Sequence, residues 1–119
     1  WLAHIATQAV VVTATDRASI RGAERCARKL EEEYCIRRIR MVLNRLRPKL
    51  ICRGKTGNID DAMDEAGLPL IGIVPEDTDL IACGNSGRSI LSVPHSAAGR
   101  AFRNIARRLE GERIPLTKI

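Results

Sequence analysis

Three polar clusters follow apolar runs in this sequence, and they hold the side chains best placed to do chemistry. They are Thr13 to Asp16, Asn44 to Arg47 and Pro75 to Asp77. Ligands of open parallel sheets bind at the carboxyl ends of the strands. We therefore expect the three clusters to meet on one rim and form a ligand site. The alternative is that the clusters are polar only because a chain must turn where a strand ends.

Asn44 is the most informative residue of these clusters. Its carboxamide presents a donor beside an acceptor, which matches the N6 and N7 edge of adenine. An asparagine at a strand end is also a common turn residue that bonds the local backbone. The residue type alone leaves both readings open.

Motifs for catalysis and metal binding are missing from the sequence. No G-x-x-x-x-G-K-[ST] occurs, and in the similar stretch from Arg53 to Gly57 the helix that must leave directly from the Lys-Thr pair of a phosphate loop is interrupted by Gly57 and Asn58. The serines and the isolated His4 and His95 form no nucleophile–base arrangement. Four cysteines without C-x-x-C spacing argue against zinc or iron–sulfur ligation and favour reduced thiols in the cytoplasm. We expect neither catalytic residues nor a metal site.

The elements that must position the clusters alternate between strand and helix. Apolar runs predict strands from Ala9, over Ile39 to Arg45 and over Leu68 to Val74. Helical spacing and capping residues predict four helices: from Asp16 to about Glu33, a short one capped by Asn58 and ended by Gly67, one from Thr78 to Cys83, and one capped by Ser96 with an apolar stripe through Ala98, Ala101, Phe102, Ile105 and Leu109. This order predicts an α/β fold with a partial parallel sheet of about three strands and flanking helices.

Length and composition limit the organisation of the chain. It has 119 residues, is 45% hydrophobic and 29% charged, and carries a net charge of +6, so residues 1–119 are expected to form a single partial domain. Residues 1–8 are interpreted as the tail of a preceding helix, and residues 112–119 as an irregular C-terminal tail. A start at Trp1 inside such an element suggests a piece of a longer protein. No apolar run is long enough to cross a bilayer.

Four stretches in order resemble a known family. They are VVTATDRASIRGAERCARKLE from Val11, MVLNRLRP from Met41, PLIGIVPEDTDLIACGNSGRSIL from Pro69, and AAGRAFRNIARRLEGERIPL from Ala97. Together they are similar to the C-terminal half of the MinD-type septum-site-determining ATPases, within the MinD/ParA family of deviant-Walker-A ATPases. The resemblance extends from about Leu2 to Leu116. One departure is Thr15, which stands where the family has proline.

The resemblance implies a fold and a function. The fold would be the C-terminal half of a P-loop NTPase domain. Asn44 and Arg45 would belong to the strand end that binds the adenine edge, and Pro75, Glu76 and Asp77 to the turn whose main chain walls the base. The complete protein would bind ATP and magnesium, dimerise with ATP, associate peripherally with the membrane through a C-terminal helix and place the division site. This chain would contribute the adenine pocket but no phosphate loop, and neither ATP nor magnesium would bind tightly to it.

Other readings remain open beside this one. A ParA-like partition ATPase would bind DNA non-specifically, and Arg100, Arg103, Arg107 and Arg108 on the last predicted helix could follow its phosphates. An iron–sulfur carrier ATPase would need a C-x-x-C that is absent, and a non-catalytic interaction domain could have kept the fold alone. A free edge of the strand at Ala9 to Thr13 predicts self-association of the isolated chain.

Overall fold

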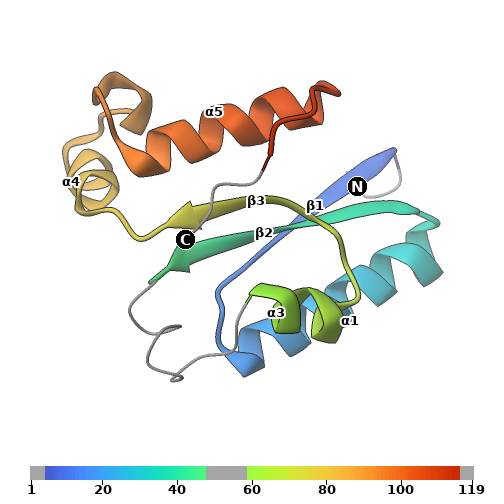
Figure 1. Cartoon of the computed structure of the whole chain (residues 1–119). Helices are drawn as coiled ribbons and strands as arrows, with labels where there is room; N and C mark the ends of the chain where they lie inside the picture. Colours follow the sequence, from blue (N-terminus) through green and yellow to red (C-terminus); the bar gives the residue numbers. More distant parts are fainter. Residues whose placement is uncertain (1–4, 48–58, 116–119) are drawn as a thin grey trace.

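A computed structural model describes residues 5–47 and 59–115, which form a three-layer α/β arrangement (Figure 1). The middle layer is a parallel sheet in the order β1-β2-β3. Its strands are β1 (Gln8–Thr13), β2 (Arg38–Leu46) and β3 (Leu70–Pro75). The predicted fold class is confirmed, because three parallel strands alternate with helices along the chain.

Helices cover both faces of the sheet, and capping residues mark where several of these helices begin or end. On one face lie α1 (Arg17–Tyr34) and α3 (Ile59–Ala66); on the other lie α4 (Thr78–Ser86), the short 3₁₀ helix η2 (Ile90–Ser92) and α5 (Ala97–Leu109) (Figure 1). Asp16 caps α1 by accepting a hydrogen bond from the Ser19 amide at 3.0 Å, and Ser96 caps α5 in the same way. Gly67 follows α3 with a φ of +69°, which a glycine adopts without a Cβ clash.

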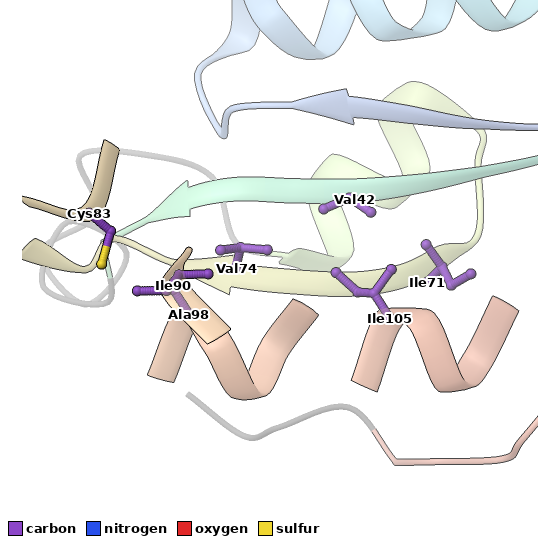
Figure 2. Packing of buried hydrophobic residues seen from close by; sticks show 7 residues of the cluster. All are labelled: Val42, Ile71, Val74, Cys83, Ile90, Ala98 and Ile105. Carbon is purple, nitrogen blue, oxygen red and sulfur yellow. The ribbon is translucent and has the colours of Figure 1, made fainter. Parts of the chain in front are cut away.

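Aliphatic side chains fill the core on either side of β2. Met41 and Leu43 are fully buried with Ile20 of α1 and with α3. On the other face, Val42 packs in a cluster with residues of β3, α4, η2 and α5: Ile71, Val74, Cys83, Ile90, Ala98 and Ile105 (Figure 2). The core is therefore aliphatic, as the scarcity of aromatic residues requires.

Close packing of α5 on β3 depends on Gly72. A Cβ built at this position would lie 2.2 Å from Cγ1 and 2.6 Å from Cδ1 of Ile105. Real carbon atoms do not approach so closely, so only glycine lets the helix sit at this distance.

Most element boundaries agree with the sequence prediction within about two residues, with two clear differences. The helix expected over residues 1–8 is wrong where the structure describes it: Ile5 to Thr7 are turn and bend, and Gln8 begins β1 because it pairs with Arg38 of β2. Helix α4 also continues to Ser86 rather than ending at Cys83.

Two expectations concern residues outside the described ranges. These are the Asn58 cap and the loop from Arg53 to Gly57. Residues 112–115 have no helix or strand, as expected of the tail. In the part of the chain that the structure describes, no helix is both long and apolar enough to cross a membrane.

Candidate functional site

The end of β2 places Asn44 and Arg45 at the rim of the sheet. The register between β2 and β3 shifts between Leu43 and Leu46, which marks an irregularity in the ladder. Arg45 lies within it with a φ of +55°, in the left-handed region that residues with a side chain rarely adopt. Strained backbone of this kind is often found at ligand sites, and here it turns the chain directly after Asn44.

The end of β3 is tied to the end of β2 at this rim. The Glu76 amide donates to the Leu46 carbonyl at 2.9 Å, and Arg47 Nη2 donates to Glu76 Oε1 at 2.8 Å. The hydrogen bond from Arg47 lowers the pKa of Glu76, and the same bond raises the pKa of Arg47. Glu76 is thus a carboxylate at neutral pH, and the two strand ends form one unit.

The Asp77 carboxylate accepts hydrogen bonds at the N-termini of two helices. Its Oδ1 accepts from the Asp79 amide at 2.9 Å and so caps α4. Its Oδ2 accepts from Ser96 Oγ at 2.7 Å and from the Ala98 amide at 3.2 Å, at the start of α5. The Ser96 hydroxyl first, and then the two amides, lower the pKa of Asp77. The Asp77 carboxylate is therefore used in capping. The main chain of this turn is then the part that can form a wall of the candidate site.

The two strand ends and α4 enclose one hollow of about 490 Å³. All five site residues predicted from the sequence line this strand-end hollow, and α4 adds four more: Asn44, Arg45, Pro75, Glu76 and Asp77 with Leu80, Ile81, Gly84 and Asn85. Leu80 and Ile81 supply an apolar wall, and Asn85 a second carboxamide. The sequence analysis missed these four, although the helical spacing of four puts position 84 on the face of 80 and position 85 on the face of 81, because the helix was expected to end at Cys83.

Asn44, one of the residues that line this hollow, has an unused hydrogen-bonding atom. Its Oδ1 is buried and has no hydrogen-bond partner among the described residues. A buried acceptor without a partner is costly, and ligand sites are where such groups are kept. The turn-forming alternative would have bonded this oxygen to the local backbone, which the described part of the chain does not show.

The first polar cluster does not line the strand-end hollow. Asp16 caps α1, and Thr13 is buried and donates to the Ala14 carbonyl at 3.0 Å. Thr15 lines a separate hollow of about 460 Å³ between α1 and α3, where Arg17 and Arg21 approach Glu65 at 3.9 and 3.7 Å. The structure thus brings two of the three expected clusters together.

A third hollow, of about 480 Å³, lies at the opposite end of the sheet. It is lined by the start of β2, the turn before β3 and α1, including Arg28, Arg37 and Glu31. None of the predicted site residues lies there. Among the residues described, no group of three or more acidic, histidine or cysteine side chains could hold a metal ion.

The arginines of α5 are mostly engaged within the chain. Arg103 donates to the Leu91 carbonyl at 2.9 Å, and Arg107 bonds Glu112 at 2.8 Å. Arg108 donates to three carbonyls, those of Ile71, Ile114 and Pro115, each at 2.9 Å. Phosphate binding would require Arg103, Arg107 and Arg108 to give up these partners, which weighs against DNA tracking by this helix.

Known proteins resemble the chain in both sequence and structure. It is 40% identical over 111 residues to the septum site-determining protein MinD of Bacillus subtilis, a match covering 93% of this chain and 41% of that protein. The MinD cell division protein of Aquifex aeolicus superposes with a TM-score of 0.89 at 33% identity, over 95% of this chain and 48% of that one.

A more distant structure shares the fold alone. The septum site-determining protein of Pyrococcus horikoshii, complexed with Mg-ADP, has a TM-score of 0.75 at 20% identity, over 88% of this chain and 42% of that one. No family model matches the sequence. The chain spans about two-fifths of the length of the curated relatives it matches. In sequence and structure, therefore, the chain is similar to part of the MinD-type septum-site-determining proteins, and it has the α/β fold of the MinD/ParA ATPases.

Proposed function

We propose that this chain supplies the adenine-binding part of an ATP site in a division-site placement ATPase. The observation that carries the proposal is the buried, unpartnered Oδ1 of Asn44, a residue that lines the strand-end hollow. A rotation of the carboxamide about χ2, the Cβ–Cγ bond, would present Oδ1 to the N6 donor of adenine and the amide nitrogen to N7. The main chain at Pro75 to Asp77 would wall the base on one side.

The phosphates and the metal would be bound elsewhere in the complete protein. Phosphoryl transfer requires donors that cradle the phosphates and a metal that neutralises their charge, and the sequence contains no such loop. ATP and magnesium therefore belong to the complete protein in this proposal, and this chain alone would hold ATP through its base. Affinity from so small a contact would be about millimolar.

Ligand-observed NMR titration of the purified chain with ATP tests the proposal. Asn44→Ala should weaken binding by about 1–3 kcal/mol, as expected for a lost bidentate contact to a base. Asn104→Ala is the matched control, because Asn104 lies on α5 and does not line the hollow. Tight ATP binding that Asn44→Ala leaves unchanged would show that the base binds elsewhere.

The isolated chain should not hydrolyse ATP above the background rate. The reason is the missing phosphate cradle, since positioning and charge stabilisation supply nearly all of the catalysis of phosphoryl transfer. A phosphate-release assay with magnesium checks this. Turnover that disappears on substitution of a residue of this chain would contradict it.

Three further properties belong to the same proposal and concern the whole protein. They are ATP-dependent dimerisation, peripheral association with a membrane surface, and placement of the division site. The partition reading with DNA binding is separated from this one by salt dependence, because affinity for phosphates falls steeply with added salt. Absence of DNA binding at low salt would remove the partition reading.

A further inference from the structure

The third hollow, of about 480 Å³, has walls from three parts of the chain. Glu24, Ala27, Arg28 and Glu31 line it from α1, and their spacing of three and four residues places them on one stripe of the helix. The other walls come from the segment that begins β2 and from the turn that precedes β3. This volume falls within the range of ligand pockets in proteins, about 300–1,000 Å³.

Helices α1 and α3 both end beside the third hollow, at the end of the sheet where β2 and β3 begin (Figure 1). The amides of Cys35 and Ile36 donate to the Leu30 carbonyl, and Cys35 adopts a φ of +57°. The Gly67 amide donates to the Met63 carbonyl at 2.8 Å. These hydrogen bonds fix both turns, and the partial negative charge of a helix C-terminus favours a cationic group of a ligand there.

The floor of the third hollow is apolar. Ala27 and Ile39 are buried in one core cluster, Ala66 is buried in the neighbouring one, and Leu68 packs against both. An aliphatic group of a ligand placed on this floor would exchange water for contact with these side chains, which is favourable.

Charges of both signs stand around this floor without neutralising one another. Glu24 and Arg28 form an ion pair within α1. Glu31 on the α1 side, and Arg37 and Arg38 on the β2 side, have side chains with no hydrogen bond or ion pair to any other residue that the structure describes. One carboxylate and two guanidinium groups therefore remain available on opposite walls.

A third arginine keeps the β2 wall positive. Arg40 also lines the hollow, and its Nη2 donates to the neutral Gln8 Oε1 at 2.9 Å. Burial, and secondly the charge of Arg38, lower the pKa of Arg40, as expected where cations gather without an anion between them. The potential is thus positive at this wall and negative at Glu31.

We propose that the third hollow is a docking site for a peptide segment of a partner protein that carries an acidic and a basic side chain on either side of an aliphatic residue. The acidic side chain would accept hydrogen bonds from Arg37 and Arg38, and the basic one would pair with Glu31. The aliphatic side chain would cover Ala27 and Leu68. The residues that line this site and the strand-end hollow are different, so the inference does not depend on nucleotide binding.

The arrangement of charge argues against other occupants. A nucleotide or another polyanion would bring several negative charges toward Glu31, and a purely basic segment would face Arg37 and Arg38. Like charges brought together in this way oppose binding and so select against such partners. A segment with one charge of each sign satisfies both walls.

Peptide titrations of the isotopically labelled chain, followed by amide shifts, test the proposal. Four tripeptides blocked at both ends serve as probes: Asp-Leu-Lys and Lys-Leu-Asp, which carry both charges, and Asp-Leu-Asp and Lys-Leu-Lys, which carry one sign only. One of the two mixed peptides should shift the amides of Glu31, Arg37, Arg38 and Gly67 along a single saturating curve. It should bind about fivefold more tightly than either peptide of one sign.

Reversing the charge of each wall should change which peptide binds best. Glu31→Lys should make Asp-Leu-Asp the tightest ligand, and the double variant Arg37→Glu with Arg38→Glu should make Lys-Leu-Lys the tightest. The matched controls are Glu33→Lys and Arg25→Glu, which reverse exposed charges of α1 outside the hollow and should keep the preference of the unchanged chain.

Circular dichroism should show that all variants are folded. The proposal would be overturned if neither mixed peptide gave saturating shifts at these amides, if a peptide of one sign bound the unchanged chain most tightly, or if both reversals left the preference unchanged.

Discussion

At the residue scale, Asp77 joins the candidate site to the packing of two helices. Its carboxylate accepts hydrogen bonds from the starts of α4 and α5 while its main chain borders the strand-end hollow. Asn44 and Arg45 lie across the hollow on β2, where an unusual backbone conformation turns the chain. Binding and stability therefore depend on neighbouring residues, and substitutions can separate the two.

Asp77→Ala should lower the free energy of unfolding by roughly 2 kcal/mol at pH 7, about 1 kcal/mol for each capped helix. Hydrogen bonds lower the pKa of Asp77 in the folded chain below its usual 3.8, so its contribution is complete above that value and is lost as the pH falls through the folded pKa. Urea unfolding at pH 7 and pH 2.5 checks this, with Asp79→Asn as the control on α4. A difference between Asp77→Ala and the unchanged chain that grew at pH 2.5 would contradict the capping role.

At the scale of elements, what the sequence can predict depends on how local the cause is. The helices at Arg17–Tyr34 and Ala97–Leu109 follow from capping residues and apolar spacing, which are local, and their prediction is confirmed. The start of β1 at Gln8 depends on pairing with Arg38, thirty residues away, and the local sequence suggested helix instead. The left-handed backbone conformation of Arg45 depends on the register of β2 against β3, and no residue type in the sequence predicts it.

The candidate site likewise contains residues that the local sequence predicts and residues whose position depends on long-range packing. The strand-end residues could be named from the sequence because parallel strands end at a common rim. The wall formed by Ile81 and Asn85 could not be placed, since its position depends on how Asp77 orients α4 against the sheet. Thr15 was expected to share one ligand site with these residues and instead lines a separate hollow beside α3, which packs against α1.

Gly72→Ala should destabilise the chain by about 1–3 kcal/mol, because the added methyl overlaps Ile105 and forces α5 away from β3. Ile105→Ala removes both overlapping atoms at its own cost of about 2–5 kcal/mol. The double variant should be more stable than the sum of the two losses predicts, by about 0.5–3 kcal/mol. Strictly additive losses in a denaturant double-mutant cycle would show that the two residues do not determine the spacing.

At the scale of the whole molecule, the described fold leaves strand edges without a sheet partner. Within the described ranges β1 pairs only with β2, and its other side presents main-chain donors and acceptors. The outer strand β3 is partly protected, since Arg108 donates to its Ile71 carbonyl. The β1 edge is therefore the surface through which this chain would pair with another strand.

We expect the isolated chain to self-associate, most simply as a dimer through the β1 edge, because antiparallel pairing of two such edges satisfies their main-chain groups. Sedimentation equilibrium over a range of concentrations measures this, with the mass of the chain verified independently. A folded monomer whose amides at Val10 to Val12 resist hydrogen exchange would rule it out.

The central claim is that a nucleotide base binds in the strand-end hollow, and mapping of amide shifts tests it most directly. Titration of the isotopically labelled chain with ATP should shift the amide resonances of Asn44, Arg45, Glu76, Ile81 and Asn85 along one saturating curve. Amides at the opposite end of the sheet, such as Arg37 and Gly67, should stay in place. Shifts concentrated at Arg37 and Gly67, with Asn44 and Asn85 unchanged at saturation, would contradict the account.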